Sequence, residues 1–299
     1  EIAQCLVGSE MCIRDRPWVN GASMNNQGVE FTVSFKSDPS SEFQWAVSAN
    51  IGTYKTELTD LPSNVINKYA GDGVHDLILG RSPNSAYGLV ADGIFKTQEE
   101  VDAHADQPGK AVGRIRYKDL DGDGVINETY DRTWIGCYDP DFFGGLNFDF
   151  AYKGFDLNLF FEGMFGNDVN SYWKKESDIW LFTNPAWKNH ATRMLGGWSP
   201  DNPNSDIPAI SNNTANQEQR FSSWFIEDGS YIKLRNIELG YTFPTKLIKK
   251  MHMSNLRLYA AAYNVFTLKK FWGDDKYTSF DPERPSYHYL TPVSYTHLR

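Results

Sequence analysis

The sequence predicts an all-β chain, a fragment of an antiparallel transmembrane β-barrel with long extracellular loops. Six segments carry apolar residues at every second position, the period of a strand with one apolar face. Short and long connections alternate strictly between these segments, as they do in outer-membrane barrels. Aromatic residues make up 15% of the chain, which also holds 24 glycines, and this composition favours strands and loops over helices.

The first four predicted strands come in two pairs. Residues 31–36 and 43–51 are separated by a short turn at 38–41, and residues 146–152 and 155–165 by Lys153-Gly154. Polar residues fill the alternate positions, which is typical of half-buried strands. The apolar positions of the four strands are Phe31, Val33, Phe35, Phe43, Trp45, Val47, Ala49, Ile51, Leu146, Phe148, Phe150, Tyr152, Phe155, Leu157, Leu159, Phe161 and Phe165.

The fifth and sixth strands form a third pair, at residues 231–243 and 256–266. The apolar face of the fifth strand changes sides near Asn236, which predicts a β-bulge there. The connector at 244–255 has room for one helical turn. In a barrel, we expect the lipid-facing surface to include Phe148, Phe150, Phe155, Leu157, Leu159, Phe161, Leu256 and Leu258.

The long connections lie between the pairs, at residues 54–141 and 166–221. Short periplasmic turns that alternate with long external loops are typical of an outer-membrane barrel. A soluble β-sandwich is the alternative, because its strands also alternate. The polar alternates favour the barrel, since they suit a wet lumen; they are Asn147, Asp149, Asp156, Asn158 and Glu162.

Composition and motifs exclude several classes of protein. The 29 Lys and Arg residues against 38 Asp and Glu residues leave a net charge of −9, which argues against nucleic acid as a partner. No apolar run reaches the roughly 18 to 20 residues of a spanning helix. The three cysteines form no CxxC motif. The sequence has no HExxH, GxSxG, P-loop or dinucleotide motif, and we therefore expect no enzymatic activity.

An acidic loop at residues 119–131 carries carboxylates at metal-binding spacing. Positions 1, 3 and 5 of a calcium loop supply carboxylates, position 6 is a glycine and position 7 supplies a backbone carbonyl. The sequence matches this pattern with Gly124 at position 6. The predicted ligands of a structural Ca²⁺ ion are Asp119, Asp121, Asp123, the carbonyl of Val125, and Asp131.

The loop departs from the calcium pattern at position 12, where Tyr130 replaces the usual bidentate glutamate. Asp131 follows directly and is one candidate to complete the ligand shell, with Glu128 as the other. The alternative interpretation is a turn rich in Asp and Gly that binds nothing.

Tryptophans gather in the second long connection and just beyond it. Their flat faces suit stacking on sugar rings, but packing of the loops onto one another and onto a partner explains them equally and is the interpretation we favour. The tryptophans are Trp173, Trp180, Trp187, Trp198 and Trp224.

Five segments together resemble the C-terminal part of SusC/RagA-type TonB-dependent outer-membrane transporters. They follow one another in order at the family's spacing, and YGLVADGIFKTQEEVDAHADQPG (87–109) precedes the acidic loop as in that family. The five segments are GRIRYKDLDGDGVINETYDRTWIG (113–136), DPDFFGGLNFDFAYKGFDLNLFFEGMFGNDV (139–169), WSPDNPNSDIP (198–208), WFIEDGSYIKLRNIELGYTFP (224–244) and SNLRLYAAAYNVFTL (254–268).

This resemblance implies import of oligosaccharides or related large nutrients across the outer membrane of a Gram-negative cell. It implies as partners a SusD-like surface lipoprotein, a glycan or peptide substrate, membrane lipid and lipopolysaccharide, and TonB through an N-terminal part that this chain lacks. The alternative function is a secreted β-sandwich that binds glycans, or a glycoside hydrolase, with a calcium-stapled loop.

Both ends of the chain resemble translated sequencing-library adapter. Residues 1–16 read EIAQCLVGSEMCIRDR, without the charged start or continuous apolar stretch of a signal peptide. We therefore expect residues 1–16 and 293–299 to be non-native scars, and residues 17–292 to be the C-terminal part of the transporter barrel.

Overall fold

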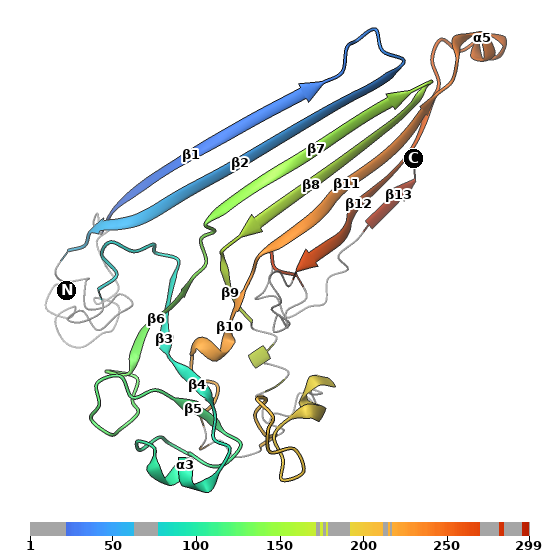
Figure 1. The fold of residues 1–299 in the computed structure, drawn as a ribbon. Coiled ribbons are helices and arrows are strands. Elements are labelled where there is room, and N and C mark those ends of the chain that lie inside the picture. The colour runs from blue at the N-terminus through green and yellow to red at the C-terminus, as the bar shows by residue number, and fades with distance from the viewer. Residues whose placement is uncertain are drawn as a thin grey trace, which may run out of the picture.

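One seven-stranded antiparallel sheet dominates the computed structural model, which describes residues 22–62, 77–171, 174–175, 178, 192–211, 215, 217–269, 281–283 and 295–298. The strands lie side by side in chain order, as Figure 1 shows. They are β1 (Ser23–Lys36), β2 (Phe43–Asp60), β7 (Phe142–Tyr152), β8 (Phe155–Phe165), β11 (Tyr231–Thr242), β12 (Arg257–Lys269) and β13 (Tyr295–Leu298). The six predicted strands are thus confirmed as one contiguous sheet. No described helix is long and apolar enough to cross a membrane.

The three short connections lie together at one end of the sheet (Figure 1). Lys153 and Gly154 adopt φ angles of 48° and 89°, the two positive values that a two-residue hairpin turn of matching twist requires. The turn between β1 and β2 is closed by Asp38, whose carboxylate accepts the Ser40 N–H at 2.8 Å. The connector before β12 holds a helical turn, α5 (Thr245–Ile248), and a 3₁₀ turn, η5 (Lys249–Met251). Each of these connections was predicted from the sequence.

The first hairpin is longer than the alternation predicts. β1 begins at Ser23 and β2 ends at Asp60, and their register continues through pairs such as Gly28 with Tyr54. Residues 23–30 are mostly polar on both sides, so the period-2 signal is absent there. Backbone hydrogen bonds to β2 extend β1 over these residues, although their side chains do not alternate.

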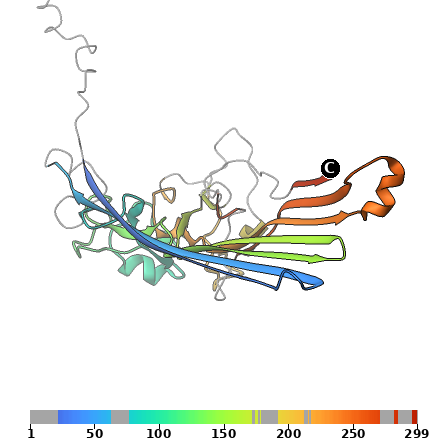
Figure 2. The ribbon, with the colours of Figure 1, turned by 90° about the horizontal axis from the view of Figure 1, so that it is seen from above.

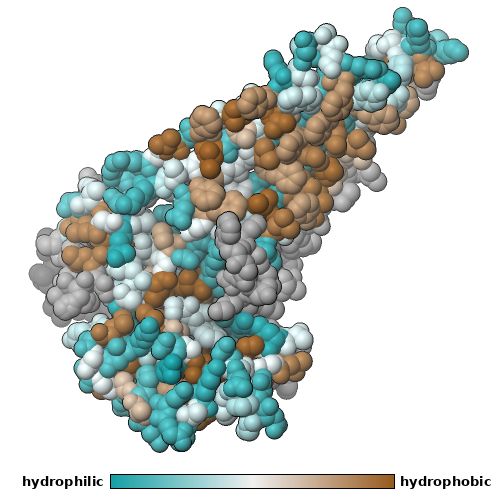
Figure 3. Space-filling model, in the orientation of Figure 1, coloured by the Kyte–Doolittle hydropathy of each residue, from teal (hydrophilic) through white to brown (hydrophobic). Residues whose placement is uncertain are grey.

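The strand register sorts the side chains of the sheet into one apolar and one polar face. Residues directly opposite each other on neighbouring strands share a face. One such row joins Phe148, Leu159 and Ile237, and the next joins Phe150, Leu157 and Leu239. All eight predicted lipid-facing residues except Leu256, which precedes β12, lie in strands. Figure 3 shows hydrophobic residues gathered over the strands.

The apolar face is open to solvent. Phe155, Leu239 and Leu258 are 54%, 52% and 56% exposed. No described core cluster includes these three residues, because most of the buried apolar residues lie beyond the sheet. The described buried apolar residues within the sheet are Leu58, Tyr231, Leu234 and Ala261. Figure 2 shows the sheet as one thin, gently bent layer. The described strands therefore do not form the two stacked sheets of a sandwich, and their sheet is open at β1 and β13.

The predicted bulge in the fifth strand is confirmed. The register of β11 shifts between Leu234 and Asn236 against both of its neighbours, which leaves Arg235 without a cross-strand partner. The neighbouring strand β12 carries Asn264 with a φ of 51°, in the left-handed region that asparagine tolerates. The bulge keeps Leu234 and Ile237 on the same apolar face.

The two long connections are not plain loops but fold together into a lobe, here the described parts of residues 77–141 and 166–230. The lobe lies at the end of the sheet opposite the short turns (Figure 1). Its elements are β3 (Ser85–Leu89), β4 (Ala91–Ile94), α3 (Gln98–Ala103), β5 (Ile115–Tyr117), β6 (Arg132–Cys137), β9 (Asp168–Asn170), η2 (Thr192–Gly196), η4 (Ser223–Phe225) and β10 (Ile226–Asp228). Its core joins both connections through Leu89, Ile94, Ile115, Tyr117, Ile126 and Phe225.

Candidate functional site

The polar face of the sheet carries a hydrogen-bonded ladder of amide and carboxylate side chains. The Asn158 side-chain amide donates to Asp149 Oδ1 at 2.7 Å and to Asn147 Oδ1 at 3.0 Å. Asn236 continues the ladder onto β11 by donating to Asn158 Oδ1 at 3.0 Å. Asn147, Asp149 and Asn158 therefore share one polar face, as predicted.

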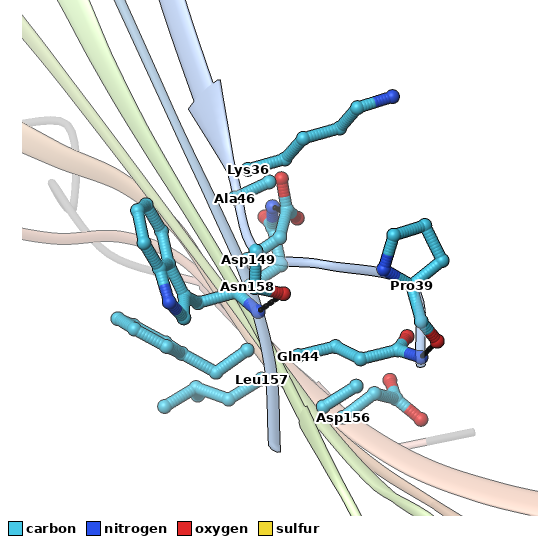
Figure 4. Close-up of a pocket in the computed structure, with 12 residues that line it drawn as sticks. Lys36, Pro39, Gln44, Ala46, Asp149, Asp156, Leu157 and Asn158 are labelled. Carbon is cyan, nitrogen blue, oxygen red and sulfur yellow. Dashed lines mark hydrogen bonds between the residues drawn. The ribbon is translucent and has the colours of Figure 1, made fainter. Parts of the chain in front are cut away.

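A hollow of 360 Å³ opens near the short-turn end of the sheet. Figure 4 shows that Gln44, Asp149, Asp156 and Asn158 surround it, beside the small side chain of Ala46. Gln44 closes one side by donating from Nε2 to the Pro39 carbonyl at 3.0 Å. Apolar atoms form most of the wall of the hollow, which includes Trp45, Phe150 and Leu157. The polar side chains of the wall can bond water or sugar hydroxyl groups.

The opposite end of the polar face carries a compact charged network, which the sequence analysis missed. Arg235, freed from strand pairing by the bulge, donates from Nε to Glu162 Oε2 at 2.5 Å and from Nη1 to Asn264 Oδ1 at 3.1 Å. Arg235 and Lys233 both pair with Glu283. Glu162, Arg235 and Glu283 are far apart in the sequence, so no local sequence motif predicts the network.

A buried ion pair holds the two halves of the lobe together. Arg114 Nη1 lies 2.7 Å from Glu218 Oε2, and both side chains are less than 10% exposed. Glu218 also accepts the Ile115 N–H at 2.9 Å. Burial raises the pKa of the Glu218 carboxyl and lowers the pKa of the Arg114 guanidinium. Each charge therefore depends on its partner.

The side chain of Gln107 substitutes for a neighbouring strand along β5. Its Nε2 donates to the Ile115 carbonyl at 2.7 Å, and its Oε1 accepts the Tyr117 N–H at 3.0 Å. Both bonds are buried, so they satisfy backbone groups that would otherwise be left unpaired. Burial also raises the pKa of Tyr117 to about 12. β5 is therefore held within the buried core of the lobe.

The acidic loop brings its first three predicted ligands together. Carboxylate oxygens of Asp119, Asp121 and Asp123 lie within 4.8 Å of one another. Asp119 accepts the N–H groups of Gly122 at 2.6 Å and Gly124 at 2.9 Å, and the hydrogen bond from Gly124 is the main cause of its lowered pKa. Gly124 has a φ of 85°, the conformation for which the calcium loop uses glycine.

Asp131 lies outside that group of three and closes the base of the loop. Its two oxygens accept the N–H groups of Leu120 at 2.8 Å and Asn127 at 2.7 Å, and the residue is fully buried. The Val125 carbonyl faces only a long contact of 3.4 Å from the Asn127 amide. Metal binding by Asp131 and Val125 stays a prediction.

The tryptophans that the structure describes act in packing. Trp198 and Trp224 pack against the core of the lobe, and Lys174 Nζ lies 4.7 Å from the centre of the Trp224 ring. Trp173, Trp180 and Trp187 lie outside the described residues. Packing of the loops onto one another is thus observed for Trp198 and Trp224, and packing onto a partner stays a prediction.

The chain is similar in sequence to several TonB-dependent receptors. No protein-family model matches the chain. It is 31% identical over 264 residues to TonB-dependent receptor P3 of Formosa agariphila, covering 86% of this chain and 25% of that protein. It is 26% identical over 265 residues to TonB-dependent receptor SusC of Bacteroides thetaiotaomicron, covering 86% of this chain and 24% of that protein.

The solved structure of the RagAB peptide transporter shares the fold. It aligns with a TM-score of 0.66 at 23% identity and covers 88% of this chain and 27% of that chain. The chain is therefore similar to a segment of TonB-dependent receptors in sequence and to RagAB in fold. SusC and RagAB are among these relatives, which confirms the resemblance to SusC/RagA-type transporters that the motifs predicted. The chain spans about a quarter of the length of the curated relatives it matches, and these are named receptors rather than enzymes.

Proposed function

We propose that this chain forms part of the barrel wall of an outer-membrane importer for oligosaccharides or related large nutrients. The observation that carries the proposal is the division of one continuous sheet into an exposed apolar face and a hydrogen-bonded polar face. An exposed apolar face suits lipid, and a polar face suits a water-filled lumen. The lobe then lies outside the membrane, because only the long connections of such barrels face the exterior.

The partners follow from the proposed class. A SusD-like surface lipoprotein would contact the lobe, and TonB would engage the full-length receptor. Glycans or peptides are the proposed cargo, and the RagAB peptide transporter, which shares the fold, supports the peptide part of this range. Membrane lipid and lipopolysaccharide would contact the apolar face, since both present acyl chains.

Uptake in living cells tests the import proposal. Deleting the full-length gene in its host is expected to abolish uptake of fluorescently labelled oligosaccharides or oligopeptides that the parent strain accumulates. Uptake should return with the intact gene, and it should fail again when TonB is inactivated. Undiminished uptake of every labelled nutrient in the deletion strain would contradict the proposal.

We also propose that the acidic loop binds a structural Ca²⁺ ion. The support is the convergence of three carboxylates within 4.8 Å on a backbone that turns at Gly122 and Gly124, both with positive φ. Nearby negative charges repel one another, and a cation removes that cost. Since Asp106 N–H bonds the Gly124 carbonyl at 2.7 Å, an ordered loop would also order its neighbour in the lobe.

Calorimetry of the full-length receptor tests the calcium proposal. Asp121→Ala and Asp123→Ala are each expected to abolish a weak calcium site, with a dissociation constant of about 10⁻⁴ to 10⁻³ M in the parent. Asp102→Ala is the matched control, because it removes an exposed carboxylate from α3 of the same lobe. Equal calcium affinity in all four proteins would mean that the loop is only a turn.

A further inference from the structure

A cavity of 530 Å³ lies where the polar face of the sheet meets the lobe. β8 contributes Glu162 and Met164 to its wall, and β11 contributes Tyr231. The lobe contributes Tyr138 and residues 167–170. This mouth cavity therefore lies at the end of the polar face through which a cargo from outside would enter.

The wall of the mouth cavity is acidic. Its lining includes the carboxylates of Glu162, Asp168 and Glu283, and none of the described residues that line it carries a positive charge. Arg235 and Lys233 neutralise Glu162 and Glu283 from outside the lining. Asp168, the third carboxylate, is therefore the one whose charge these two cations do not neutralise.

Asp168 has no ion-pair partner in the part of the chain that the structure describes. Its Oδ2 accepts the Cys137 N–H at 2.8 Å, which fixes the side chain but leaves the negative charge uncompensated. Burial raises the pKa of Asp168, and the nearby carboxylates Asp141 and Asp228 raise it further. Such a site gains from a positive charge placed beside it.

Two further features of the wall suit an organic cation. Tyr138 lines the cavity, and aromatic rings attract cations to their faces. Tyr231 also lines it, but Lys233 Nζ already lies 5.5 Å from the centre of the Tyr231 ring. Asn167 is 5% exposed, lines the cavity and has an Oδ1 atom without a hydrogen-bond partner among the described residues. An ammonium group donates up to three hydrogen bonds, which matches this unused acceptor.

We propose that the mouth cavity binds an ammonium group of the imported nutrient, with the Asp168 carboxylate as its counter-ion and the Asn167 Oδ1 atom as a second acceptor. This inference rests on the proposed import function. Ammonium groups occur both on lysine side chains and on glucosamine units, so the experiment includes both sources.

Binding to the purified full-length receptor tests this inference with two matched pairs of probes. One pair is an oligopeptide with a single lysine and the same peptide with norleucine. The other is a glucosamine oligosaccharide and its N-acetylated form. The receptor is expected to prefer the ammonium member of at least one pair by about tenfold. The pair that shows the preference identifies the source of the group.

Asp168→Asn is the decisive variant, because an asparagine Oδ1 can still accept the Cys137 N–H while the charge is removed. We expect it to abolish the preference. Glu283→Gln, on the other side of the cavity, should weaken it. Asp102→Asn makes the same charge change on α3, outside the cavity lining, and should leave the preference intact.

A preference that survives Asp168→Asn would overturn the inference. So would a receptor that binds and imports the neutral probes but does not favour the ammonium members, and in that case the import function would stand. A receptor that neither binds nor imports any probe would overturn both proposals.

Discussion

Replacing Leu159 with arginine is expected to prevent the receptor from assembling in the outer membrane. Leu159 lies in the middle of β8, on the apolar face, directly opposite Phe148 on one side and Ile237 on the other. An arginine on the lipid face near the midplane of the bilayer costs about 2–4 kcal/mol. Folded barrels resist unfolding by detergent without heat, so electrophoresis of unheated membrane fractions should show the folded band largely lost.

Asn158→Arg is the matched control for Leu159→Arg, because it introduces the same side chain one residue away on the opposite face. Asn158 belongs to the polar ladder beside Asp149, where water and a carboxylate can receive the new charge. This variant should assemble. If Leu159→Arg assembled as well as the parent, the apolar face would not face lipid and the barrel proposal would be wrong.

Replacing Arg114 with leucine is expected to loosen the lobe without unfolding the sheet. Glu218 would remain buried without its partner, and breaking a buried ion pair from one side costs about 3–5 kcal/mol. The effect should be local, because two side-chain partners of Arg114, Glu218 and the Ala209 carbonyl, both lie in the lobe. Hydrogen exchange in the full-length receptor should accelerate across β4 and β5 and stay unchanged in β7 and β8.

Two further variants separate the buried charge from general damage. Lys96→Met removes another cation that ties the two long connections, but its partner Asp206 is 88% exposed, so the cost should be about 0–1 kcal/mol. The double variant Arg114→Leu with Glu218→Leu removes both buried charges and should recover part of the protection. Equal exchange in Arg114→Leu and the parent would mean that the pair contributes nothing.

The sheet could be predicted from the sequence because its signal is local. Residues such as Leu157, Leu159 and Phe161 place apolar side chains at every second position and so predict a strand with one apolar face. Lys153-Gly154 predicts the hairpin turn that joins this strand to the preceding one. The acidic loop could also be predicted from the sequence, because its three carboxylates are spaced two residues apart. Each of these features depends on side chains within a few positions of one another.

The lobe could not be predicted, because its short strands depend on distant contacts. β4 and β5 have only four and three residues, too few for an alternating pattern to stand out. Ile115 is held there by Glu218, 103 residues away, through a hydrogen bond that no local pattern encodes. The mouth cavity was missed for the same reason, because β8, β9 and β11 contribute its wall.

The core of the lobe also has a consequence for the order in which the chain can be built. The Ala91 N–H bonds the Ser223 Oγ, 132 residues further on, and the whole β7–β8 hairpin lies between them. A ribosome synthesises the first connection long before the second. Leu89 and Ile115 therefore cannot pack against Phe225 until the second connection has been synthesised. The strand pairs form between near neighbours at little entropic cost, whereas closing the lobe spans a far longer loop. The apolar residues of the first connection therefore cannot complete their core until the second connection has been made.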